Sequence, residues 1–175
     1  MEDTLRTRAD ELLEILTNMM GDLTIAVSII REYEEKPHMH KPELRVSRQC
    51  IWRLCLNSIV LNCCKFEELN RKYAKEMNQI IPEYNSLRGE YNEIIKNNKS
   101  IQSLRNDYVA HVNSSRTKNA LTPDEVQSHI KAIVGSESAN DFLDWVCPER
   151  VETTDLDKSL VGVVLQLRDS LGSKL

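Results

Sequence analysis

Glycine, proline and aromatic residues are all scarce in this chain of 175 residues. It contains 5 glycines and 5 prolines, and aromatic residues make up 5% of it. Obligatory turns are therefore few, which favours long helices with few connections over a sheet-rich fold. No internal repeat and no strand-like alternation of apolar and polar residues is visible. The sequence predicts an all-α fold, an antiparallel helical bundle.

Long apolar runs and an excess of positive charge are also lacking. Residues 1–10 carry alternating charges and do not resemble a signal peptide. No apolar run is expected to reach the ~20 residues of a membrane span. We therefore expect a cytoplasmic protein with no membrane partner. The net charge of −4 argues against a protein that coats nucleic acid indiscriminately, but it allows a local basic patch.

The cysteines show neither a disulfide pattern nor a metal-binding pattern. Four of the five fall in one apolar segment and no pair has CxxC spacing: Cys50, Cys55, Cys63, Cys64 and Cys147. We expect reduced thiols in the core. His38 and His40, with Glu43 nearby, could bind a metal ion, but a solvated turn is the simpler interpretation. With no Gly-rich phosphate loop and no HExxH pattern, the sequence predicts no metal site and no cofactor.

Hydrophobic periodicity predicts helices over residues 3–35, 42–78, 82–112, 122–135, 140–146 and 154–171. Gly21 could bend the first, and Asn97–Ser100 is the weak point of the third. Thr122, followed by Pro123 and Glu125, forms a capping box at the start of the fourth. We expect a bundle domain over residues 1–135 and a C-terminal helical extension, packed on the bundle, over 136–175.

The segment 42–78 is apolar around most of its circumference, which predicts a central, buried helix. Polar side chains inside it must then find partners or face a cleft: Arg53, Asn57, Ser58, Asn62 and Lys65.

The string LRNDYVAH, residues 104–111, holds the most informative group of polar residues. In an α-helix Arg105, Tyr108 and His111 would lie at i, i+3 and i+6, and the long arginine side chain could lean back toward the histidine. A histidine that titrates near neutrality can take a proton from a ribose 2′-hydroxyl. A guanidinium can bind the phosphate oxygens as negative charge builds on them. The pair therefore suits metal-independent cleavage of a phosphodiester.

The charge around this motif favours an anion site. Residues 94–118 contain five basic side chains and one acidic side chain, although the whole chain is acidic. Arg116 lies in this stretch, Asn62 and Lys65 could assist phosphate binding, and Tyr108 could stack on a base. Core packing is the competing interpretation for Tyr108, and buried hydrogen bonds to neighbouring helices are the competing interpretation for Asn62 and Lys65.

LRNDYVAH resembles the signature of HEPN domains, in which an arginine is followed by a polar residue, often asparagine, then by three to five residues and a histidine. The segment IWRLCLNSIVLNCCKFEELN, residues 51–70, is similar to the apolar helix of the abortive-infection subgroup. There a hydrophobic run ends in a basic, an apolar and an acidic residue, as it does here at Lys65-Phe66-Glu67. The resemblance covers residues 1–135.

This resemblance implies a HEPN-like bundle that acts as a toxin or antiphage endoribonuclease and leaves a 2′,3′-cyclic phosphate. Arg105 would hold the scissile phosphate, His111 would be the general acid and base, and Asn106 would position the site. The resemblance also implies single-stranded RNA as substrate and a homodimer whose two motifs share one cleft, and it leaves room for a protein antitoxin. Asn113 replaces a tyrosine that is modified in one toxin subgroup, so regulation by that route is not expected.

Two other interpretations stay open. A non-catalytic HEPN-like module would bind RNA, a nucleotide or a partner protein through the same cleft. Alternatively, the protein is a purely structural bundle whose match to the motif is accidental, because an arginine and a histidine occur at similar spacing by chance. Arg31 and His38 are an example, and Pro37 between them rules out a shared helix.

Overall fold

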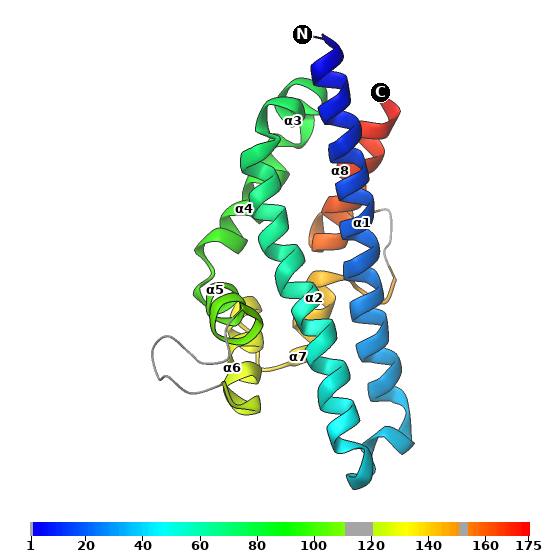
Figure 1. Ribbon diagram of the computed structural model, residues 1–175, viewed down its shortest axis with the longest axis vertical. Helices are drawn as coiled ribbons and strands as arrows, with labels where there is room; N and C mark the ends of the chain where they lie inside the picture. Colours follow the sequence, from blue (N-terminus) through cyan, green and yellow to red (C-terminus); the bar gives the residue numbers. More distant parts are fainter. Residues whose placement is uncertain (1, 111–120, 151–153) are drawn as a thin grey trace.

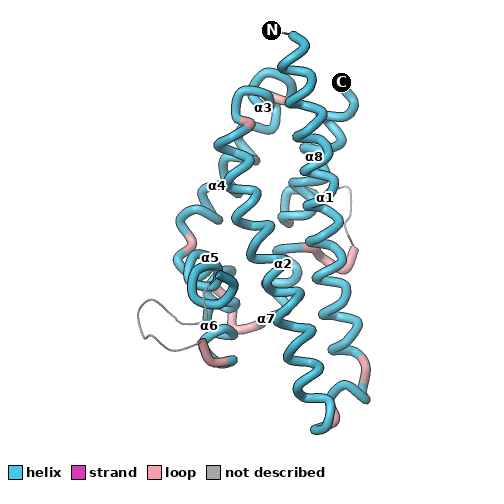
Figure 2. Tube along the Cα trace, viewed as in Figure 1, coloured by secondary structure: helices cyan, strands magenta, loops and turns pink. Residues whose placement is uncertain are grey.

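A computed structural model describes residues 2–110, 121–150 and 154–175 of the chain. The described residues form helices joined by short connections, with no β-strand among them. The two longest helices run antiparallel, the shorter ones pack around them, and both termini lie at the same end of the molecule (Figure 1). Figure 2 shows how little of this part of the chain is loop. The predicted all-α antiparallel bundle is confirmed.

Helix α1 (Glu2–Glu35) runs without interruption through Gly21. Its apolar stripe supplies the middle of the core, where seven side chains are at most 1% exposed: Ala9, Leu12, Leu16, Met19, Leu23, Val27 and Ile30. By length and composition alone, Leu5–Glu35 would suffice to cross a membrane. The expectation that no stretch reaches that length is therefore wrong for this helix. A long helix that supplies a bundle core has the same composition, and α1 packs in this way against α2 and α8.

The predicted helix over residues 42–78 is divided in the structure. A 3₁₀ turn (Pro42–Leu44) leads into α2 (Arg45–Lys72), and α3 (Ala74–Ile80) follows after a break at Tyr73. The Tyr73 ring is buried, and the Arg8 guanidinium lies 4.7 Å from its centroid. Helix α2 is less buried than its apolar cover on most sides predicted, because Leu54 is 66% exposed and Leu61 is 43% exposed. One face of α2 belongs to the core and the other faces solvent.

The predicted helix over residues 82–112 is divided as well. After a 3₁₀ turn (Pro82–Tyr84), α4 (Asn85–Asn97) ends at the expected weak point. Asn98 then caps α5 (Lys99–Ser103), and its side-chain oxygen accepts hydrogen bonds from the backbone N–H groups of Ser100 and Ile101. A π-helix (Leu104–Ala110) follows and carries most of the LRNDYVAH motif.

The remaining helices close the bundle. Helix α6 (Pro123–Val134) has the predicted capping box at Thr122 and ends at Gly135, which takes a left-handed φ of 65°. Helix α7 (Ala139–Val146) is tied to α1 by Arg31, which donates hydrogen bonds to the Cys147 carbonyl oxygen and to the Asp144 carboxylate. A 3₁₀ turn (Leu156–Lys158) precedes α8 (Leu160–Ser173), which lies beside α1 (Figure 1).

The C-terminal segment shares its core with the rest of the chain. Leu160, Val163, Val164 and Leu171 are fully buried and belong to the same apolar cluster as the side chains of α1 and α2. The helices within residues 136–175, which we expected to pack on the bundle, therefore contribute side chains to the same core. The C-terminal helices are an integral part of one bundle.

Candidate functional site

Buried contacts on both sides hold the N-terminal part of the motif in place. Leu104 is fully buried at the start of the π-helix, and Ile101 is buried one turn earlier. The Asn98 side chain donates to the Ile133 carbonyl oxygen at 3.1 Å, which joins the start of α5 to the end of α6. His129 of α6 contacts the Ser100 hydroxyl at 3.2 Å. The motif is thus attached to the bundle by α5 and α6.

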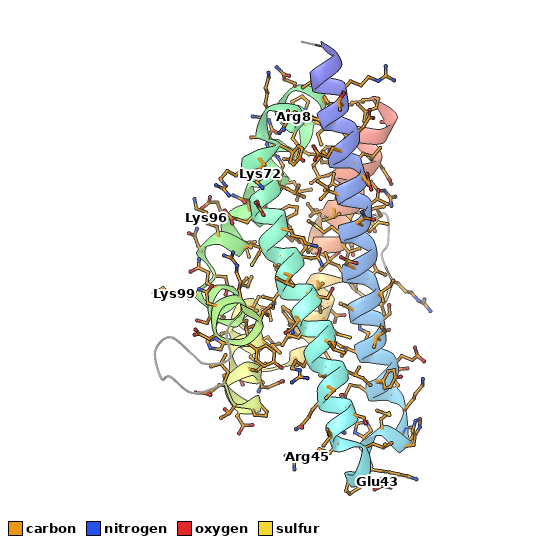
Figure 3. The ribbon with its side chains drawn as sticks, in the orientation of Figure 1. Arg8, Glu43, Arg45, Lys72, Lys96 and Lys99 are labelled. Carbon is orange, nitrogen blue, oxygen red and sulfur yellow. The ribbon has the colours of Figure 1, made fainter. Side chains whose placement is uncertain are left out.

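A pocket of about 300 Å³ lies beside the motif, and we call it the Arg105 pocket. Cys64 and Glu67 of α2, Ile95 and Lys96 of α4, Ile101 and Gln102 of α5, and Arg105 and Asn106 of the π-helix line it. Arg105 and Asn106 are both exposed. Figure 3 shows Lys96 and Lys99 on the outer edge of the molecule at α4 and α5, close to the start of the motif. Two of the three predicted catalytic residues, Arg105 and Asn106, therefore line one pocket, and lysine side chains lie at its edge.

One acidic residue of α2 also faces this pocket. Glu67 lines it, and the positive charge of Arg105 contributes to lowering the pKa of Glu68, although the hydrogen bond from Lys72 is the main cause. Burial raises the pKa of the Cys64 thiol, and Arg105 acts in the opposite direction. The Arg105 guanidinium is therefore close to the C-terminal half of α2, where Cys64 and Glu67 line the same pocket.

The π-helix turns Tyr108 away from Arg105. A π-helix closes i→i+5 hydrogen bonds and has a wider turn than an α-helix, so residues three apart no longer share a face. Tyr108 lines a second and larger hollow of about 880 Å³, which we call the α2–α6 groove. The prediction that Arg105 and Tyr108 lie on one face of a helix is therefore wrong. Burial raises the pKa of Tyr108, and the nearby Arg53 opposes this shift.

The other candidate residues lie elsewhere. Asn62 is 2% exposed, and its amide donates to the Ser58 carbonyl oxygen at 2.9 Å and to Asp22 of α1 at 3.4 Å. It therefore lies in the α1–α2 interface and not in a phosphate-binding cleft, as the competing interpretation held. Lys65 is exposed on α2 and lines neither hollow. His111 and Arg116 lie outside the described residues, as does Asn113.

Sequence reasoning missed several residues of the two hollows. Gln102 and Cys64 of the Arg105 pocket gave no signal, because an amide and a thiol are common on any helix. Arg53 could be found from the sequence, because a charged residue in an apolar helical segment must find a partner or face a cleft. The structure places it in the α2–α6 groove. No group of three or more possible metal ligands occurs in the part of the chain that the structure describes.

The comparisons with known proteins identify a relative with a solved structure. The chain resembles the integron cassette protein Vpc_cass2 from the mobile metagenome of V. paracholerae, with 48% sequence identity and a TM-score of 0.79. The match covers 95% of this chain and 96% of that one. At this identity and coverage, the chain belongs to the same family as that cassette protein. No model of a known protein family matches the sequence, and no curated protein matches it significantly.

Proposed function

We propose that this protein is a metal-independent endoribonuclease of the HEPN toxin or antiphage type. The observation that carries the proposal is the position of Arg105 and Asn106. Both side chains are exposed and line the Arg105 pocket together. Both belong to the motif that resembles the HEPN signature, and His111 completes it. π-Helices are rare and occur often at functional sites, which fits a motif carried on Leu104–Ala110.

In the proposed reaction, Arg105 binds the non-bridging oxygens of the scissile phosphate through its planar fork of donors. His111 removes the proton from the ribose 2′-hydroxyl, and the 2′-oxygen then attacks the adjacent phosphorus. The 5′-oxygen of the next nucleotide leaves and takes up a proton from the protonated imidazole. The products are a 2′,3′-cyclic phosphate and a free 5′-hydroxyl. Asn106 helps to hold the phosphate in line.

Lys96 and Lys99 support this assignment because they add positive charge at the edge where an RNA backbone would approach (Figure 3). Neighbouring cations of this kind raise the local concentration of a polyanion even when the whole protein is acidic. As in HEPN enzymes, we propose that the protein works as a homodimer on single-stranded RNA, with a protein antitoxin as its inhibitor.

The test is to incubate the purified protein with several single-stranded RNAs in EDTA. Wild-type protein should cleave, and His111→Ala and Arg105→Ala should each lower the rate by at least about 100-fold, as expected when a general base or a charge-stabilising group is removed. Arg150→Ala and His38→Ala are the matched controls, because both side chains are exposed and line neither hollow. Cleavage that persists in both motif variants would refute the assignment.

A second candidate function is a non-catalytic module that binds RNA, a nucleotide or a partner protein at the same pocket. Glu67 favours it, because a carboxylate in the lining repels the phosphate that a nuclease must hold there. RNA binding without cleavage would support this candidate. In that case His111→Ala should leave the RNA affinity unchanged while Arg105→Ala weakens it.

A further inference from the structure

The α2–α6 groove is a second hollow, separate from the Arg105 pocket. Its volume of about 880 Å³ lies within the range typical of small-molecule sites. Its floor is apolar and well packed, since Leu56 is 2% exposed, Val126 is 8% exposed and Ile130 is 1% exposed. Neither Arg105 nor Asn106 lines it.

Two aromatic side chains border this groove. The Trp52 indole N–H donates to the Glu34 carboxylate at 2.5 Å, so its polar group is already satisfied and its ring is held in a fixed orientation. Tyr108 borders the groove from the π-helix, and its hydroxyl is close enough to Arg53 for the charge to influence its pKa. A planar ring entering the groove would therefore meet apolar side chains and two aromatic side chains.

The charged residues of the groove are mostly basic. Arg48 and Arg53 both line it, and neither forms an ion pair with any residue that the structure describes. Arg48 donates to Nδ1 of His40 at 2.8 Å, and Nε2 of that ring lies 2.7 Å from the Glu34 carbonyl oxygen. Glu34, the acidic residue of the lining, is already bound by Trp52.

We infer that the α2–α6 groove binds a small organic anion with a planar aromatic body. The apolar floor and the two rings take the body of the ligand. Arg48 and Arg53 take its carboxylate, sulfonate or phosphate group, whose negative charge is complementary to the two guanidinium groups. Of the motif residues that the structure describes, Tyr108 lines this groove, whereas Arg105 and Asn106 do not.

Two related dyes test this inference directly. 8-Anilinonaphthalene-1-sulfonate carries an aromatic body and an anionic group, and N-phenyl-1-naphthylamine has nearly the same body without the charge. Titration of the folded protein with each dye, followed by fluorescence, separates the contribution of the arginines from that of the apolar floor. The melting temperature of every variant is measured alongside, so that dye binding to unfolded protein is recognised.

The sulfonate dye should bind with one-to-one stoichiometry. Arg48→Gln and Arg53→Gln should each weaken its binding by about threefold to tenfold, the range for charge-assisted contacts that are partly exposed to water. Binding of the neutral dye should be unchanged. Arg71→Gln is the matched control, an exposed arginine of α2 that does not line the groove.

Arg105→Ala should also bind the sulfonate dye normally, so the groove can be tested whether or not the protein proves to be a nuclease. The inference is overturned if the double variant of Arg48 and Arg53 folds and binds the sulfonate dye as tightly as wild type does. Failure of the wild-type protein to bind this dye in a saturable way would overturn it as well.

Discussion

Gly162, near the start of α8, is the position where one added carbon atom has the most severe consequence. A Cβ atom at this residue would lie 2.1 Å from the carbonyl oxygen of Leu156 and 2.8 Å from its carbonyl carbon. Both are backbone atoms of the 3₁₀ turn that precedes the helix. They cannot move away as a side chain would. We predict that Gly162→Ala displaces this turn from α8.

The surroundings make the displacement costly. Leu160 and Val163 are fully buried on either side of Gly162, and the Tyr91 hydroxyl holds the turn by donating to the Asp157 carbonyl oxygen at 2.9 Å. Overpacking of this kind costs typically 1–3 kcal/mol, and a clash with backbone belongs at the upper end, at about 3 kcal/mol. For a chain of this length, the melting temperature should fall by roughly 6–12 °C.

Thermal unfolding followed by circular dichroism measures the effect. Gly89→Ala is the matched control, because Gly89 lies inside α4 and a Cβ there would meet nothing within 4 Å. That variant should gain up to about 1 kcal/mol from helix propensity and melt slightly higher than wild type. If Gly162→Ala melts at as high a temperature as Gly89→Ala, the close contact between α8 and the turn at Leu156 is refuted.

Three further predictions concern buried polar groups. Tyr91→Phe should lose about 1 kcal/mol in urea unfolding, because the hydrogen bond to the Asp157 carbonyl oxygen is lost. Burial raises the pKa of Tyr91 to about 12, so the wild-type protein should become less stable between about pH 10 and 12, and the variant should show no such loss. Burial favours a higher pKa for Glu76, but the hydrogen bond from Arg8 and other contacts lower it overall, so Glu76 stabilises the fold above its ordinary pKa and this stability is lost as the pH falls below it. Glu76→Gln should therefore make the melting temperature depend less on pH between about pH 3 and pH 6. The same fall in melting temperature toward low pH in both proteins would contradict this. Arg88, 8% exposed, donates to three asparagine side chains, and Arg88→Met should cost about 2 kcal/mol; a wild-type urea midpoint would show that these bonds contribute nothing.

The helices were predictable wherever local chemistry determines them. The periodicity of residues 3–35 gave α1 almost to the residue, and the capping box at Thr122 gave the start of α6. The break at Tyr73 was not predictable, because no proline or glycine marks it; in the structure the Tyr73 ring is buried and the Arg8 guanidinium lies over it. Such tertiary contacts override a helical pattern that would otherwise continue.

The geometry of the motif was only partly predictable. LRNDYVAH marked Arg105 and Asn106 as candidate site residues, and the structure places both in the lining of one hollow. The same string has the apolar spacing of an ordinary α-helix, so nothing in it revealed the π-helix that turns Tyr108 to the other side. Asn62 was misplaced for a related reason, since the polar side chain of a mostly apolar helix can face either a cleft or a neighbouring helix. Its partner Asp22 lies 40 residues away in the sequence.

The ends of the RNA fragments test the proposed chemistry most directly. Products formed in EDTA can be analysed by mass spectrometry for the wild-type protein and for His111→Ala. We predict fragments that end in a 2′,3′-cyclic phosphate, with a 5′-hydroxyl on the adjoining fragment, and their loss in the variant. Fragments with a 3′-hydroxyl and a 5′-phosphate, or the same cyclic ends from His111→Ala, would contradict the proposal that Arg105 and His111 carry the reaction.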